Sequence, residues 1–63
     1  MRDKNRIYGF IMKLFTLWIR YPDLRFGQLV ADIAAYGEYK DLFYVEDDEL
    51  QAVIEQMLDG GFF

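Results

Sequence analysis

Residues 4–21 are apolar on nearly every side, and this feature constrains the fold of the 63-residue chain more than any other. Two stripes at spacings of three and four residues run along the segment, as expected for a helix. The stripe that we expect to face the core contains Ile7, Phe10, Ile11, Leu14, Leu17, Trp18 and Tyr21. The second stripe, predicted to be an oligomer interface, contains Tyr8, Met12, Phe15 and Ile19. Only Gly9, Lys13, Thr16 and Arg20 form a polar seam.

A proline ends this first helix, and a second helix follows it. Pro22 disfavours the helical conformation in the preceding residue and lacks a backbone N–H, so the first helix is predicted over residues 4–20. Asp23 is expected to be the N-cap of a second helix over residues 24–36, with Gly37 as its stop. The short connection predicts that the two helices pack as a hairpin or an angled corner. The apolar stripe of the second helix is Phe26, Leu29, Val30, Ile33 and Ala34.

The third helix is predicted over residues 48–59, with Asp47 or Asp48 as its N-cap and Gly60 as its end. Before it, residues 41–45 form a short apolar run without a second run to pair with as a strand. We expect this run to be an extended or single-turn segment whose aromatics, Phe43 and Tyr44, fill the core. The apolar stripe of the third helix is Leu50, Val53, Ile54, Met57 and Leu58. The whole pattern predicts a compact all-α fold of three helices, a single helical domain over residues 1–63.

A domain of this size is marginally stable on its own. It buries only about 60% of the surface that its unfolded chain exposes. The sequence contains no cysteine and no histidine, so disulfides and the usual zinc ligands are absent, and no metal or other cofactor is expected. Association with another chain is the remaining source of stability, so we expect a homo-oligomer that forms through the first helix.

The apolar segment is not predicted to be a membrane anchor or a signal peptide. From Ile7 to Ile19 it contains Lys13 and extends about 20 Å as a helix, against roughly 30 Å for the hydrocarbon core of a bilayer. Tyr21, Pro22 and Asp23 follow it, in place of the small residues of a cleavage site. These observations, with the lack of cysteine, favour a cytoplasmic protein that does not bind membranes.

The charges are distributed unevenly along the chain. The net charge is −4, but residues 1–25 carry six basic and two acidic side chains (+4), and residues 26–63 carry one basic and nine acidic side chains (−8). This asymmetry favours packing of the first helix against the C-terminal half, within one chain or between two. It disfavours direct nucleic-acid binding, which needs a basic surface.

The acidic run from Glu46 to Glu49 has three possible interpretations: helix capping, partner binding or a metal site. Capping explains it adequately, because the run lacks the alternating acids and the glycine of an EF-hand. Arg25 is expected to pair with Glu46 or Asp47, and Arg20 with the acidic C-terminal half. Packing does not explain Arg25 or Gln28. The candidate partner-binding residues are Arg25, Gln28, Glu46, Asp47, Asp48, Phe62 and Phe63.

The residue types that catalysis needs are scarce, so the chain is not expected to be an enzyme. There is no serine, cysteine or histidine, and Thr16 is the only hydroxyl nucleophile besides the tyrosines. Gly60 and Gly61 precede no helix, so phosphate-binding loops are absent as well. Tyr39, Phe43, Tyr44 and Phe63 are suited to stacking on nucleic-acid bases, but with Lys40 as the only nearby cation they are more typical of a core or a protein interface.

Two segments carry a resemblance to known proteins. Residues 21–33, YPDLRFGQLVADI, contain P-D-L-R with a G-Q-L run soon after, and residues 41–50, DLFYVEDDEL, contain an aromatic F-Y followed by E-D and a leucine. This pattern resembles small uncharacterised proteins of bacteria and their phages, and covers about a third of the chain. The resemblance implies a phage or prophage setting but transfers no activity and no site.

The sequence therefore predicts a non-enzymatic protein-interaction module that forms a homo-oligomer and binds or modulates an unidentified host protein. The alternative is an acidic inhibitor that mimics nucleic acid on a host enzyme. That alternative requires six carboxylates to line one exposed face, and it fails if they scatter or pair with Arg20 and Arg25: Asp41, Glu46, Asp47, Asp48, Glu49 and Glu55.

Overall fold

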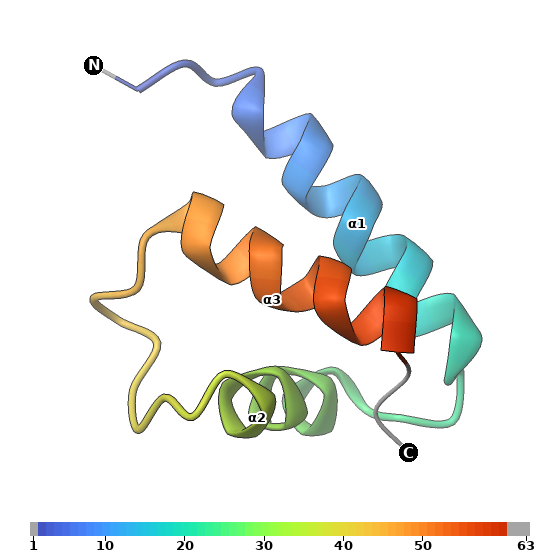
Figure 1. Ribbon diagram of the computed structural model, residues 1–63. Helices are drawn as coiled ribbons and strands as arrows, with labels where there is room; N and C mark the ends of the chain where they lie inside the picture. Colours follow the sequence, from blue (N-terminus) through green and yellow to red (C-terminus); the bar gives the residue numbers. More distant parts are fainter. Residues whose placement is uncertain (1, 61–63) are drawn as a thin grey trace.

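The chain forms three helices, and the third lies between the other two (Figure 1). The computed structural model describes residues 2–60, in which no strand occurs. The helices are α1 (Arg6–Arg20), α2 (Phe26–Tyr36) and α3 (Asp47–Gly60). Helices α1 and α2 both pack mainly against α3, so of the two predicted arrangements, a hairpin or an angled corner, the hairpin does not form. The predicted all-α, three-helix fold is confirmed.

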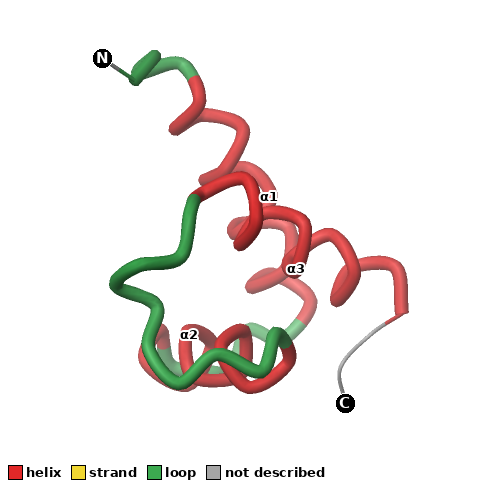
Figure 2. The backbone as a smooth tube through the Cα atoms, turned by 60° about the vertical axis from the view of Figure 1, so that its left-hand side comes forward, coloured by secondary structure: helices red, strands yellow, loops and turns green. Residues whose placement is uncertain are grey.

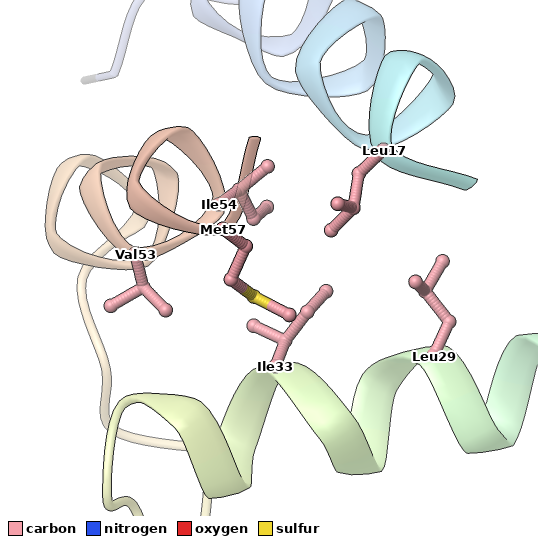
Figure 3. Close-up of a cluster of buried hydrophobic side chains, with 6 residues drawn as sticks. All are labelled: Leu17, Leu29, Ile33, Val53, Ile54 and Met57. Atoms are coloured by element: carbon pink, nitrogen blue, oxygen red, sulfur yellow. The ribbon is translucent and has the colours of Figure 1, made fainter. Parts of the chain in front are cut away.

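The core consists of six buried side chains that point into the space between the helices (Figure 3). They are Leu17 from α1, Leu29 and Ile33 from α2, and Val53, Ile54 and Met57 from α3. All six belong to the predicted apolar stripes. Around them pack Phe10, Leu14, Trp18, Tyr21, Leu24, Tyr39, Leu50 and Leu58, which are partly buried.

Helices α1 and α3 run in the same direction, and polar contacts join them along their length (Figure 1). Arg6 pairs with Asp47 at their beginnings, Lys13 Nζ lies 3.4 Å from Glu55 Oε1 midway, and Arg20 donates to the carbonyl oxygen of Leu58 at their ends. Two residues of the polar seam of α1, Lys13 and Arg20, thus contact α3. The basic first helix packs against the acidic C-terminal half within one chain.

Two predicted core residues of α1 lie outside the core. Ile7 and Ile11 are about half exposed, although they belong to the stripe of Leu14 and Trp18. Near its C-terminal end α1 is flanked by both α2 and α3, whereas its N-terminal part has only α3 beside it (Figure 1). Among the described helices, only α3 packs against this part of α1.

The first two helices begin later than predicted. Asp3 to Tyr8 are linked by i to i+3 backbone hydrogen bonds, and the α-helix begins at Arg6. Residues Tyr21 to Leu24 form a turn, because the Leu24 N–H donates to the Tyr21 carbonyl and the Trp18 indole donates to the Leu24 carbonyl. Helix α2 therefore begins after this turn. Its N-cap is Arg25, and the prediction of Asp23 at this position was wrong.

The acidic start of α3 also differs by one residue from the prediction. Helix α3 begins at Asp47, and the first intrahelical bond joins the Leu50 N–H to the Glu46 carbonyl. Asp47 and Asp48 therefore lie inside the first turn, where their charges favour the positive end of the helix dipole. The expected N-cap role of these two residues was wrong.

Helix α2 ends in a Schellman motif whose left-handed residue is not the glycine. The Tyr39 N–H donates to Ala34 O (2.8 Å) and the Glu38 N–H to Ala35 O (3.1 Å). Glu38 has the positive φ of 61°, while Gly37 has a φ of −81°. Gly37 is needed for a different reason: a Cβ there would lie 2.7 Å from Cδ2 of the Tyr39 ring, which packs over this turn.

We expect Glu38→Gly to stabilise the domain by roughly 1 kcal/mol, because only glycine adopts the left-handed conformation without steric cost. Gly37→Ala should instead destabilise it, by about 1–3 kcal/mol, because the added methyl group displaces the Tyr39 ring. Urea unfolding followed by circular dichroism measures both changes. If Gly37→Ala proved stabilising, the explanation by Tyr39 packing would be wrong.

The Tyr39 hydroxyl donates to Glu49 Oε1 (2.9 Å), and this hydrogen bond, with desolvation and the carboxylate charge, raises the pKa of Tyr39 above its ordinary value of 10.0. The neutral phenol is thus favoured in the folded state. Its contribution to stability is complete below about pH 10 and is lost as the pH rises through the raised pKa. In an absorbance titration at 295 nm, one tyrosine should ionise at a higher pH in the native chain than in Glu49→Ala. Superimposable curves would contradict this.

Candidate interaction surface

The outer face of α1 carries a continuous apolar band. It consists of the four predicted interface residues and the two isoleucines beside them: Ile7, Tyr8, Ile11, Met12, Phe15 and Ile19. The four predicted residues are between 58% and 75% exposed. A contiguous apolar patch on a small protein marks an interaction surface more often than scattered apolar residues do. The band is therefore the first candidate site.

A shallow apolar hollow lies at the C-terminal end of this band. Phe15, Trp18, Ile19 and Pro22 line it, and its volume is about 220 Å³. The Trp18 ring is held from two sides: its Nε1 donates to the Leu24 carbonyl (2.8 Å), and the Phe26 ring packs against it at a centroid distance of 5.5 Å. The hollow thus has a fixed aromatic wall.

Phe43 and Tyr44 form a second exposed apolar feature, in the loop between α2 and α3. Their side chains are 80% and 83% exposed, so the prediction that they fill the core was wrong. The Val45 N–H donates to the Leu42 carbonyl (3.1 Å), which places both aromatics at the corner of a turn. Leu42 and Val45 at the ends of this turn are half-buried, whereas the corner side chains point away from the domain. The predicted single-turn conformation is confirmed.

We call residues 42–45 the aromatic turn. The Asp41 carboxylate accepts the Phe43 N–H (3.0 Å) and so fixes the start of the turn. The two rings meet edge to face, with centroids 4.8 Å apart. Their loop arches away from the three helices (Figure 2). The chain therefore presents two large rings in a defined arrangement.

The acidic candidates Glu46 and Asp47 pair with the N-terminal arginines. Arg2 Nη2 lies 2.8 Å from Glu46 Oε2, and Arg6 pairs with Asp47. Within residues 2–60, Arg25 takes part in no ion pair, so its expected link to this run was wrong. The structure places Arg2 and Arg6 there because α1 and α3 begin side by side.

The other carboxylates of the acidic half have separate contacts. Glu55 pairs with Lys13, Glu49 accepts the Tyr39 hydroxyl, and Asp48 accepts the Glu49 N–H (2.8 Å). No group of His, Cys, Asp or Glu in the described part of the chain is arranged to hold a metal ion. Glu46, Asp47 and Glu55 have basic partners in Arg2, Arg6 and Lys13, whereas no carboxylate of this set forms an ion pair with Arg20 or Arg25 within residues 2–60.

The remaining candidates have local roles or lie outside the described residues. The Gln28 side chain accepts the Arg25 N–H (2.8 Å), so Gln28 caps the start of α2. Arg20 donates to a carbonyl at the end of α3, where the helix dipole favours a cation. The Thr16 hydroxyl donates to the Met12 carbonyl (2.7 Å) of its own helix. Phe62 and Phe63 lie outside residues 2–60.

The sequence predicted four residues of the band and the turn at residues 42–45, but it predicted neither the exposure of Phe43 and Tyr44 nor the hollow. The hollow depends on how Pro22 turns the chain beside Trp18 and Phe15, which periodicity does not describe. A signal for the turn was present, since Asp41 is a residue type that starts turns through its side chain.

Comparison with known proteins identifies no family for this chain. No family model, no curated protein and no solved structure matches it. Among residues 2–60, no helix has the length and apolar composition that crossing a bilayer requires. The function is therefore inferred from the α1 band, the hollow and the aromatic turn.

Proposed function

We propose that this chain is a non-enzymatic protein-interaction module that associates with copies of itself through the outer face of α1. The exposed six-residue band carries this proposal. It is continuous and lies on a single rigid helix. Interfaces of this kind bury apolar anchors at their centre and exclude water from them.

The free energy gained by burying the band determines the expected affinity of self-association. Full burial of a large apolar side chain contributes roughly 1.5–3 kcal/mol, so covering six half-exposed side chains yields on the order of 5–9 kcal/mol per copy. Association costs about 4–15 kcal/mol in lost freedom of motion. A contact that covers the bands of two copies yields about twice this amount, which exceeds the cost over most of its range, so self-association is expected and depends on concentration.

We further propose that the assembled module binds and modulates a host protein in a phage or prophage setting. This part is supported only by the resemblance of residues 21–33 and 41–50 to small bacterial and phage proteins. It assigns the chain a regulatory role without a catalytic step.

Sedimentation velocity over a range of micromolar concentrations tests the self-association. The wild type should sediment faster as its concentration rises. Met12→Glu places a charge in the middle of the band and should raise the dissociation constant at least tenfold. Ala31→Glu adds the same charge at an exposed position of α2 and should leave association unchanged.

A wild-type chain that remains monomeric throughout this range would contradict the proposal. Equal weakening by Met12→Glu and Ala31→Glu would also contradict it, because the effect would then come from net charge. Far-ultraviolet circular dichroism shows whether each variant keeps its helices.

A further inference from the structure

Residues 2–60 leave two apolar features of the surface uncovered: the aromatic turn and the hollow of Phe15, Trp18, Ile19 and Pro22. They lie at opposite ends of the molecule, whose long dimension is 36 Å (Figure 1). The turn is in the loop between α2 and α3, and the hollow is where α1 meets the turn into α2. One copy therefore cannot place its own aromatic turn in its own hollow.

We infer that the aromatic turn of one copy docks in the hollow of a second copy. This inference rests on the proposed self-association and names the segment that covers one end of the α1 band. Phe43 enters the hollow and Tyr44 packs at its edge. The assignment follows from chemistry: the lining is apolar and suits a phenyl ring, whereas a tyrosine hydroxyl needs a polar partner.

The sizes of the two features are compatible. An apolar cavity of about 150 Å³ in another protein binds benzene. The hollow, at about 220 Å³, therefore holds one aromatic ring. Its opening leaves the second ring of the pair outside, in contact with the rim. The hydrogen bonds within the turn hold both rings in place before docking, which reduces the entropy lost on binding.

The sequence around the aromatic turn is more acidic than the sequence around the hollow. Next to the hollow are Arg20 and Arg25 with Asp23, and Asp59 follows Leu58, whose carbonyl oxygen accepts from Arg20. Next to the aromatic turn are Glu38, Asp41 and Asp48 with Lys40, while Glu46 pairs with Arg2. Glu38, Asp41 and Asp48 are exposed and take part in no ion pair within the described residues.

A symmetric contact between two α1 helices lacks this complementarity. Arg6, Lys13 and Arg20 of α1 contact α3, so two facing bands would bring no opposite charges together across the contact. Docking of the turn in the hollow instead brings the exposed acids next to the turn toward Arg20 and Arg25. These charges therefore favour a head-to-tail arrangement.

A head-to-tail contact has a consequence that a symmetric one lacks. Each copy presents one turn and one hollow, so every added copy leaves one of each free. Such heterologous contacts produce rings or open chains of copies. The wild type is therefore expected to grow beyond a dimer as its concentration rises.

The test uses two full-length variants that each lose one side of the contact. Phe43→Ala/Tyr44→Ala removes the rings and keeps the hollow, and Ile19→Glu places a charge in the hollow and keeps the turn. Tyr36→Ala, which removes an exposed aromatic residue on α2, is the matched control. One variant carries a fluorescent label, so that sedimentation velocity follows it separately in a mixture.

Each variant alone should have a dissociation constant at least tenfold above that of the wild type. An equimolar mixture should form a one-to-one complex with near wild-type affinity and should not grow further. Higher salt should weaken this complex, and Tyr36→Ala should associate as the wild type does.

Three outcomes would overturn the inference, and they separate it from the proposed function. If Phe43→Ala/Tyr44→Ala associates like the wild type, the inference fails and self-association through α1 stands. If both variants are monomeric and their mixture is too, the contact is symmetric and the inference again fails. A wild type that stays monomeric would contradict both the inferred docking and the proposed self-association. Circular dichroism confirms that each variant is folded.

Discussion

The packing of α3 between α1 and α2 is the interaction on which the rest of the structure depends. Ile54 and Met57 are fully buried and join the single core residue of α1, Leu17, to the two of α2, Leu29 and Ile33. With one central helix, α1 has a neighbour on one flank along most of its length. The apolar residues on its other flank remain exposed because none of the described helices covers them: Ile7, Tyr8, Ile11, Met12, Phe15 and Ile19.

Charge fixes the direction of α1 where apolar contacts are few. Acidic residues begin α3 because they favour the positive end of its dipole, and the arginines before and at the start of α1 pair with them. Each of these exposed pairs contributes little to stability, on the order of 0–1 kcal/mol. The contacts of Arg6, Lys13 and Arg20 nevertheless follow one another in the same order along α1 and α3, as the parallel packing of the two helices requires. The same pairing leaves α1 with its apolar band facing outward.

The periodicity of the sequence was sufficient to predict the helices and all six core residues, because burial imposes spacings of three and four on each helix. It did not predict the pairing of Glu46 with Arg2, which are separated by 44 positions and meet only through the parallel packing of α1 and α3. Local rules failed where a tertiary contact replaced them. Asp23 is not a cap because the Trp18 indole bonds to Leu24, and Gly37 is required by the ring of Tyr39. The exposed α1 band was predictable, whereas the hollow needs the fold.

The stability of the domain does not explain why the aromatic turn has phenylalanine and tyrosine at its corner. Corner positions of turns favour glycine, proline, asparagine and aspartate, and this chain places phenylalanine and tyrosine there. Both rings are more than three-quarters exposed, so neither contributes to the core. A local choice that opposes both turn chemistry and burial is expected where function requires it. The hollow on the other side of the molecule has the complementary property, an apolar surface that residues 2–60 leave uncovered. The described part of the chain thus presents both halves of the apolar contact that we infer between two copies.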